Sequence, residues 1–227
     1  MSTDTRRSAI WALLLSIPVP TIGVWLGMIL WPDSSIGELA FATAKVWVIG
    51  FPMMWLFYYH KRFVWPPFKP NGLAVATVSG VVIALVIFAA YYTIGTANIN
   101  PEDFRHDIEA VGLLDAEKFI LLALYWTFVN SLLEEYFWRW FIVERAQSFM
   151  SEKAAIVLSA LGFVGHHLLA MSLYFDITIA LLACAGIFVG GVIWSVLYMR
   201  YRSILPCYIS HILADAAIFI IGYNVLF

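Results

Sequence analysis

The sequence predicts an all-α polytopic membrane protein with about seven transmembrane helices and a cytoplasmic N-terminus. Of the 227 residues, 63% are hydrophobic and 12% are charged, whereas an ordinary soluble domain is roughly 45–50% apolar and about 25% charged. This composition leaves too little polar surface to cover a water-facing globule. Two further observations complete the prediction: the apolar residues fall into seven long stretches, and the basic residues gather on one side of them.

Each of these stretches is long enough to cross a bilayer as a helix, which takes about 20 apolar residues for a hydrocarbon core of ~30 Å. They are residues 8–32, 39–60, 70–101, 118–141, 154–175, 177–199 and 203–227. Apolar residues run continuously through each stretch rather than alternating, which favours helices over a β-barrel. The longest hydrophilic segment, residues 96–117, is acidic and is predicted to be a solvated loop on the outer side.

The basic residues predict the orientation, because Lys and Arg accumulate in cytoplasmic loops. With the N-terminus inside, nine of the thirteen fall on the cytoplasmic side: Arg6, Arg7, Lys61, Arg62, Lys69, Arg145, Lys153, Arg200 and Arg202. Only Arg105 and Lys118 fall outside. The first stretch is too long and lacks a cleavage site for a removable signal, so we expect a retained helix.

The composition also excludes other kinds of protein. The net charge is −2 and no basic run exceeds two residues, so we expect no nucleic-acid partner. Cys184 and Cys207 both lie in apolar stretches, which is not the pattern of a disulfide framework or a structural zinc cluster. We therefore predict one integral membrane domain over residues 1–227, and its short loops favour a prokaryotic inner (plasma) membrane.

Ionisable residues are rare inside a bilayer, because each charge there costs at least about 2.5–3.5 kcal/mol, and they mark candidate functional sites. This chain concentrates them in three of its later stretches. They are Asn130, Glu134, Glu135 and Arg139 in the fourth, His166 and His167 in the fifth, and His211 and Asp215 in the seventh. The first three spans, over residues 1–95, hold little comparable beyond Lys45 and are predicted to be accessory helices.

Helical spacing sorts the charged residues of the fourth stretch onto two faces. Glu135 and Arg139 are one turn apart, so we expect them to form an ion pair. Glu134 points about 100° away and has no cation on its own helix. A carboxyl group in that position is suited to exchanging a proton with water. Its estimated depth, near mid-membrane, matches that of His167 and His211, so the three side chains can meet.

Three motifs, each at a spacing of one helical turn, follow one another along the chain. They are Glu134-Glu135-x-x-x-Arg139, Phe163-x-x-x-His167 and His211-x-x-x-Asp215. In this order they resemble the signature of the CPBP (CAAX protease and bacteriocin-processing, Abi-type) family of intramembrane glutamate proteases. The resemblance covers roughly residues 118–222, which would then be the motif-bearing catalytic core.

This resemblance implies an intramembrane endopeptidase without a cofactor, which hydrolyses a peptide bond of a membrane-associated or lipidated substrate. The implied catalytic residues are Glu134 and His167, which activate a water molecule, and His211 and Asp215, which stabilise the oxyanion. Glu135 and Arg139 would hold the geometry of the site, and Asn130, Phe163 and His166 are supporting candidates. The implied partners are a peptide or protein substrate and the lipid bilayer.

Asp215 departs from the family pattern, because many members have Asn at this position. An ionised Asp cannot donate a hydrogen bond to an oxyanion. Asp215 is therefore either protonated and donates directly, or it orients His211 and leaves the donation to that imidazole. The first role is favoured, because the usual Asn could serve it with the same geometry.

Three other interpretations stay open. A carboxylate and two imidazoles from separate helices also suit a catalytic zinc ion, although the chain has no H-E-x-x-H pattern. A transporter or proton relay also places Glu, His and Asp near the bilayer midplane, but no repeated pair of broken helices is present. A non-proteolytic member of the same family, acting as an immunity or scaffold protein, would carry the same motifs.

Overall fold

The computed structural model describes residues 6–227, so residues 1–5 of the predicted domain lie outside the described part. The chain is 82% helical, and no β-strand occurs between Arg6 and Phe227. Within residues 6–227, seven helices are long and apolar enough to cross a membrane. They span Arg6–Leu30, Ser35–His60, Leu73–Asn98, Ala116–Ala146, Glu152–Met171, Ile177–Tyr201 and Ile204–Leu226. The predicted fold class is confirmed, whereas the side of the membrane on which the N-terminus lies stays a prediction.

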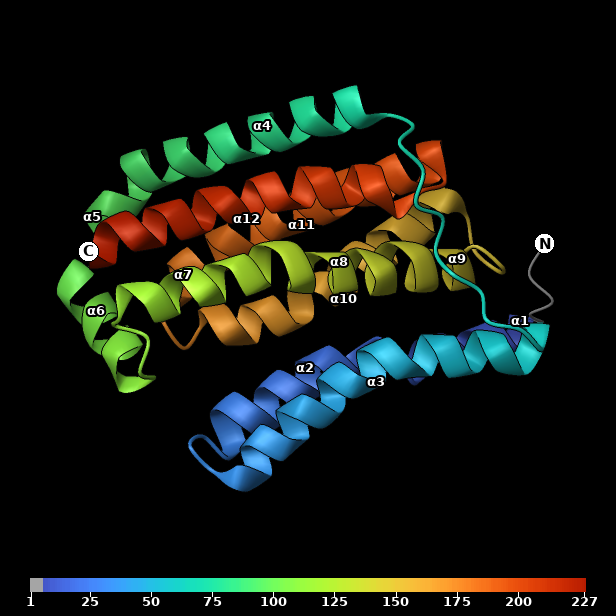
Figure 1. The fold of residues 1–227 in the computed structure, drawn as a ribbon, viewed down its shortest axis with the longest axis horizontal. Helices are drawn as coiled ribbons and strands as arrows, with labels where there is room; N and C mark the ends of the chain where they lie inside the picture. Colours follow the sequence, from blue (N-terminus) through green and yellow to red (C-terminus); the bar gives the residue numbers. More distant parts are fainter. Residues whose placement is uncertain (1–5) are drawn as a thin grey trace.

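The first two spans form a hairpin (Figure 1). They comprise α1 (Arg6–Leu14), α2 (Pro18–Val24) and the π-helical segment η1 (Trp25–Leu30), followed by α3 (Ser35–His60). Pro18 begins α2, because proline has no N–H to donate and is tolerated in the first turn of a helix. Ser34 caps α3 by accepting a hydrogen bond from the Gly37 N–H. A Cβ on Gly23 would lie 2.5 Å from the Ala44 Cβ, so glycine lets α2 pack closely on α3.

The third span is attached to the bundle through the last one. Its main helix α4 (Leu73–Ala90) lies along α12 (Ile204–Leu226) at one edge of the molecule (Figure 1). A Cβ on Gly80 would lie 2.9 Å from the Ser210 carbonyl oxygen, so the two helices can only approach this closely with glycine there. The short segments η2 (Tyr91–Gly95) and α5 (Thr96–Asn98) complete the span.

The acidic segment between the third and fourth spans contains a helix, so the prediction of a loop is wrong there. This helix, α6 (Pro101–Ala110), has no fully buried residue, but Phe104 and Ile108 are partly buried on one side. The Phe104 ring stacks on Phe175 with ring centroids 6.1 Å apart. On another side, the Arg105 guanidinium donates a hydrogen bond to the Leu226 carbonyl. Acidic residues dominate the composition of this segment. The composition therefore does not reveal that Phe104 and Arg105 contact other parts of the bundle.

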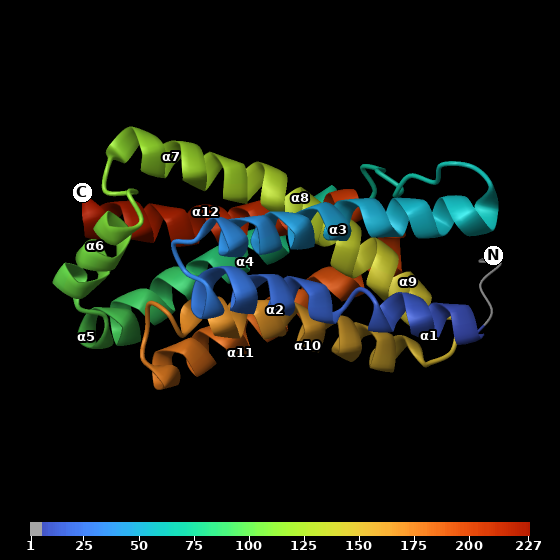
Figure 2. The ribbon, with the colours of Figure 1, turned by 90° about the horizontal axis from the view of Figure 1, so that it is seen from below.

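The fourth span begins at the edge of the molecule as α7 (Ala116–Leu124) and enters the bundle at α8 (Ser131–Glu134) and α9 (Val143–Ala146) (Figure 2). Its helix changes pitch along its length, with η3 (Tyr125–Asn130) between α7 and α8 and η4 (Glu135–Ile142) between α8 and α9. The segments η3 and η4 are π-helical, with wider turns of a kind that often occurs at functional sites. Glu134 is the last residue between them.

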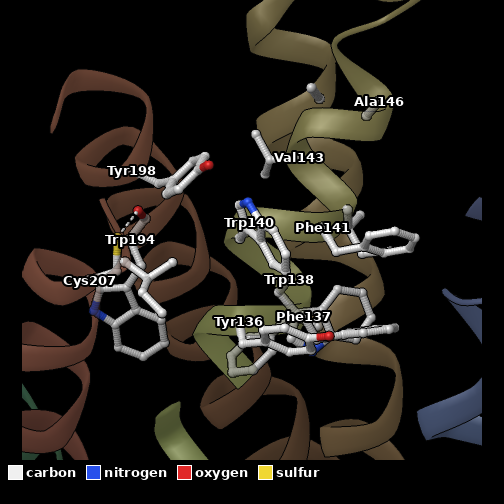
Figure 3. Packing of buried hydrophobic residues seen from close by; sticks show 14 of the residues in the cluster. Tyr136, Phe137, Trp138, Trp140, Phe141, Val143, Ala146, Trp194, Tyr198 and Cys207 are labelled. Atoms are coloured by element: carbon white, nitrogen blue, oxygen red, sulfur yellow. Dashed lines mark hydrogen bonds between the residues drawn. The ribbon is translucent and has the colours of Figure 1, made fainter. Parts of the chain in front are cut away.

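The core packs around η4, all eight residues of which are buried. The neighbouring helices are α10 (Glu152–Met171), α11 (Ile177–Tyr201) and α12. Figure 3 shows the side chains of Phe137 and Trp138 on η4 and those of Trp194 and Tyr198 on α11, which belong to one hydrophobic cluster. Inside a bilayer such packing stabilises mainly through van der Waals contact. It fixes the backbone on which the charged residues of the fourth span stand.

Candidate active site

The Glu134 carboxylate lies between imidazoles from two other helices. Its Oε1 is 3.6 Å from Nε2 of His166 on α10, and its Oε2 is 3.7 Å from Nε2 of His211 on α12. The Glu134 side chain is 12% exposed. A carboxylate at this depth requires polar partners, because hydrocarbon offers none. The structure therefore brings together three residues from three of the predicted motif-bearing spans.

The predicted ion pair between Glu135 and Arg139 is present. Arg139 Nε lies 3.2 Å from Glu135 Oε2, and both side chains are completely buried. Glu135 has a second partner, because Nδ1 of His211 lies 2.9 Å from its Oε1. The Arg139 guanidinium also contacts the Ser159 hydroxyl at 3.3 Å. Glu135 thus connects the ion pair to an imidazole that faces Glu134.

Asp215 is held in place by partners on both carboxylate oxygens. Its Oδ1 lies 3.5 Å from Nε2 of His211, one helical turn away. Its Oδ2 forms a short hydrogen bond with the Ser131 hydroxyl on α8. That hydroxyl is also 3.0 Å from the Trp126 carbonyl oxygen, although it has only one hydrogen to donate. Both oxygens of Asp215 therefore have a partner, one on α12 and one on α8.

Both histidines of α10 lie beside Glu134, with ring centroids 4.1 Å apart. Nδ1 of His167 is 2.8 Å from the Phe163 carbonyl oxygen, so it donates there and leaves Nε2 as an acceptor. Nδ1 of His166 has no hydrogen-bond partner among the described residues. Its ring stacks on Trp138 at 5.9 Å, which fixes its direction. The two neighbours therefore differ: Nε2 of His166 faces the carboxylate as a donor, and Nε2 of His167 can accept from water.

Phe163 and Trp194 pack around these polar groups. The Phe163 ring lies 4.5 Å from the His167 ring and 4.8 Å from the Arg139 guanidinium carbon. The indole of Trp194 stacks on the His211 ring, with centroids 3.8 Å apart and planes 16° apart. The motif predicts Phe163 at the site, but no motif predicts Trp194. Trp194 lies in the predicted stretch 177–199, which has no charged residues, so the sequence does not indicate that its indole covers the His211 imidazole.

Asn130 lies one helical turn from Glu134 and accepts a hydrogen bond from a lysine of another span. Its Oδ1 is 2.7 Å from Nζ of Lys45 on α3. The same Nζ lies 4.7 Å from the centroid of the Trp126 ring. The sequence marks Lys45 as an isolated charge in an apolar stretch, but it does not predict which span it faces.

These groups line the wall of a cavity of about 750 Å³. Its polar lining consists mainly of Glu38, Lys45, Asn130, Glu134, His166, His167, His211 and Asp215. The remainder is mostly apolar and comes from α2, η1, α3, α6, α7, α10 and α12. The size falls within the usual range of ligand pockets, about 300–1,000 Å³. The division into accessory helices (residues 1–95) and a catalytic core (residues 118–222) stays a prediction. Residues of both parts line the cavity.

The arrangement offers two kinds of chemistry. A carboxylate beside imidazoles in a cavity can bind a water molecule and move its protons. One ligand atom each from Glu134, His166 and His167 also lie within 4.8 Å of one another. Two imidazole nitrogens and a carboxylate oxygen are a donor set that zinc accepts. The geometry therefore identifies these three residues as the ones that could hold a metal ion.

Comparison with known families agrees with the motifs. Residues 116–217 match the sequence model of a family described as type II CAAX prenyl endopeptidase Rce1-like. No curated protein and no solved structure matches the chain. The matched segment begins at α7 and ends within α12, so it contains all the motif residues. The family resemblance is thereby confirmed over these residues, and this family implies a CAAX-type protease within the membrane.

Proposed function

Because residues 116–217 match the sequence model of the Rce1-like family, we propose that this integral membrane protein is an active endopeptidase that uses Glu134 to activate water. The observation that carries the proposal is the position of the Glu134 carboxylate, between imidazoles from α10 and α12 in the wall of a large cavity. The substrate we propose is a membrane-associated or lipidated peptide, cleaved within a prokaryotic inner membrane whose cytoplasmic side carries the N-terminus.

In the proposed reaction, Glu134 takes a proton from a water molecule while the water oxygen adds to the peptide carbonyl carbon. Nε2 of His167 accepts a hydrogen bond from the second O–H of that water. This hydrogen bond directs a lone pair of the water oxygen at the carbonyl carbon. His166 donates to the carboxylate and keeps it in place. When the carbon–nitrogen bond breaks, the proton held by Glu134 passes to the leaving amine. Atoms and charge balance without a further reactant.

The negative charge that develops on the carbonyl oxygen requires a donor. We assign this part to protonated His211. Its Nδ1 donates to Glu135 at 2.9 Å, whereas its Nε2 lies farther from its neighbours, 3.5 Å from Asp215 and 3.7 Å from Glu134, so the Nε2–H can be shared with the oxyanion. Asp215 acts as a positioning residue for this imidazole, and Ser131 holds Asp215. This assignment differs from the one that the family's usual Asn favours. It rests on the contacts to both oxygens of Asp215.

The test is cleavage by the purified protein in proteoliposomes, with a farnesylated CAAX peptide as substrate and mass spectrometry to detect the products. We expect Glu134→Gln to lower the rate by at least about a hundredfold and to retain the melting temperature of the wild type. Glu152→Gln is the matched control, because Glu152 is exposed at the start of α10, away from the cavity. Full activity of Glu134→Gln would overturn the proposal.

A further inference from the structure

Lys45 is a partly buried cation that the proposed mechanism does not use. It is the one charged residue in the apolar stretch 39–60, and it lies in the cavity wall on α3. Its Nζ donates to Asn130 Oδ1 at 2.7 Å. Within the described chain, 6–227, this ammonium group forms no salt bridge. A positive charge inside a membrane protein that no carboxylate contacts directly, although Glu134 attracts it from a distance, indicates a ligand that supplies the opposite charge.

The ammonium group has hydrogen-bonding capacity to spare. A lysine carries three N–H donors, and Asn130 accepts one of them. The ring of Trp126 covers one side of Nζ at 4.7 Å and that of Phe41 another at 5.6 Å. These rings attract the ammonium group through cation–π contacts. They do not accept the remaining two N–H groups as a ligand oxygen would. The free donors lie beside the cavity.

The distance from Lys45 to the reacting groups is set by the fourth span. Asn130 precedes Glu134 by four residues, which is one helical turn or roughly 6 Å along the axis. An extended peptide covers about 3.3–3.6 Å per residue. A group bound to Lys45 therefore lies only about two or three residues from the peptide bond that Glu134 would attack.

We infer that Lys45 binds the C-terminal carboxylate of the substrate and thereby limits cleavage to a bond near the chain end. This inference rests on the proposed protease function. A carboxylate is the anion that every peptide chain carries at its end, and it pairs with an ammonium group through charge-assisted hydrogen bonds. The cavity lining includes Trp126, which lies beside Lys45, and Leu133, which precedes Glu134 in the chain, and both suit apolar side chains in the last residues of the substrate.

The experiment compares one farnesylated CAAX peptide in two forms, with a free C-terminal carboxylate and with a C-terminal amide. Its readout is the ratio of kcat/KM for the two forms, in wild type and in variants reconstituted in proteoliposomes. We expect the wild type to prefer the carboxylate by about tenfold to a hundredfold, as a charged hydrogen bond would give. Lys45→Met should bring the ratio close to one, and Lys45→Arg should keep part of it.

Lys118→Met is the matched control, because Lys118 is exposed on α7 and does not line the cavity, so its ratio should equal that of the wild type. A wild-type ratio of one would overturn the inference without need of any variant. Equal loss of both reactions in Lys45→Met would overturn it as well, because Lys45 would then act on the charge of Glu134.

Binding of both peptides to Glu134→Gln separates this inference from the proposed function. If the carboxylate form binds more tightly but the wild type cleaves neither form, the protease proposal fails and the assignment of Lys45 stands. If cleavage occurs and the two forms bind and react equally, the assignment of Lys45 fails and the protease proposal stands.

Discussion

Nδ1 of His211 lies 2.9 Å from Oε1 of Glu135, whose other oxygen faces Arg139 at 3.2 Å. One buried carboxylate thus serves both a guanidinium and an imidazole. The ion pair and the proposed oxyanion donor share this group, so stability and activity are coupled at Glu135.

Removal of either member of the ion pair should destabilise the protein. Arg139→Ala or Glu135→Ala leaves the opposite charge buried and unpaired, which typically costs ~3–5 kcal/mol. We expect both variants to melt at a lower temperature in detergent and to be inactive. The double variant Glu135→Leu/Arg139→Met leaves no unpaired charge, so it should regain part of the stability but no activity, because His211 has lost its acceptor. Single variants that melt like the wild type would show that the pair is not structural.

The two histidines of α10 should respond differently to substitution. His167→Ala removes the acceptor that we assign to the water, so kcat should fall by roughly 10²–10⁴-fold. His166 is assigned a donor to Glu134, and the amide of His166→Asn can still donate. We therefore expect His166→Asn to be more active than His166→Ala, whereas His167→Asn should be as inactive as His167→Ala. Steady-state rates on the same peptide decide this, and the reverse order would exchange the two roles.

The sequence predicts the spans and much of the site, because both depend on patterns that are local in the chain. Glu135 and Arg139 share a helix face at one-turn spacing, and so do His211 and Asp215. Such spacings determine which side chains are neighbours on one helix. The boundaries are less well predicted, since the fourth span continues to Ala146 and not to residue 141.

The contacts between residues of different spans could not be predicted from the sequence. Ser131 looks like an ordinary small residue of a membrane helix, yet it binds Asp215 from a span 84 positions away. The pairing of Lys45 with Asn130 joins two spans in the same way. Both depend on how helices are rotated and staggered against one another, which a single sequence does not encode in any periodic pattern. The spacing of residues within each helix would be the same if Ser131 or Lys45 contacted a residue of a different span.

The predicted orientation can be tested by labelling single cysteines with a membrane-impermeant maleimide. The native Cys184 and Cys207 are both buried, so their background labelling should be low. With the N-terminus inside, a cysteine at Glu109 on α6 should react from outside intact cells. A cysteine at Lys153 should react only after the cells are lysed. Labelling at Lys153 in intact cells would reverse the predicted topology.

Metal removal tests the zinc interpretation directly. In the proposed mechanism Glu134 acts on water without a metal ion, so dialysis against EDTA and 1,10-phenanthroline should leave the cleavage rate unchanged. Zinc bound by Glu134, His166 and His167 would instead be lost, and activity would return when zinc was added. Metal analysis of the purified protein provides a second measurement, and about one zinc per chain together with chelator sensitivity would replace the proposed mechanism by a metal-assisted one.

Substitution of Asp215 by Asn separates its two possible roles. Asn keeps the shape of the side chain and supplies an amide donor. If Asp215 donated directly to the oxyanion, Asp215→Asn would match or exceed the wild-type rate. In the arrangement described above, Oδ1 faces Nε2 of His211 and Oδ2 meets the Ser131 hydroxyl. An amide NH2 turned towards His211 would oppose a donor with a donor, and turned towards Ser131 it would lose the short hydrogen bond. It also removes the negative charge that stabilises protonated His211.

We therefore expect Asp215→Asn to lower kcat by about tenfold or more with little change in KM. Ser131→Ala should produce a smaller loss in the same direction, because it frees Asp215 without removing its charge. A rate for Asp215→Asn at or above that of the wild type would restore direct donation by residue 215 and leave His211 as a positioning residue.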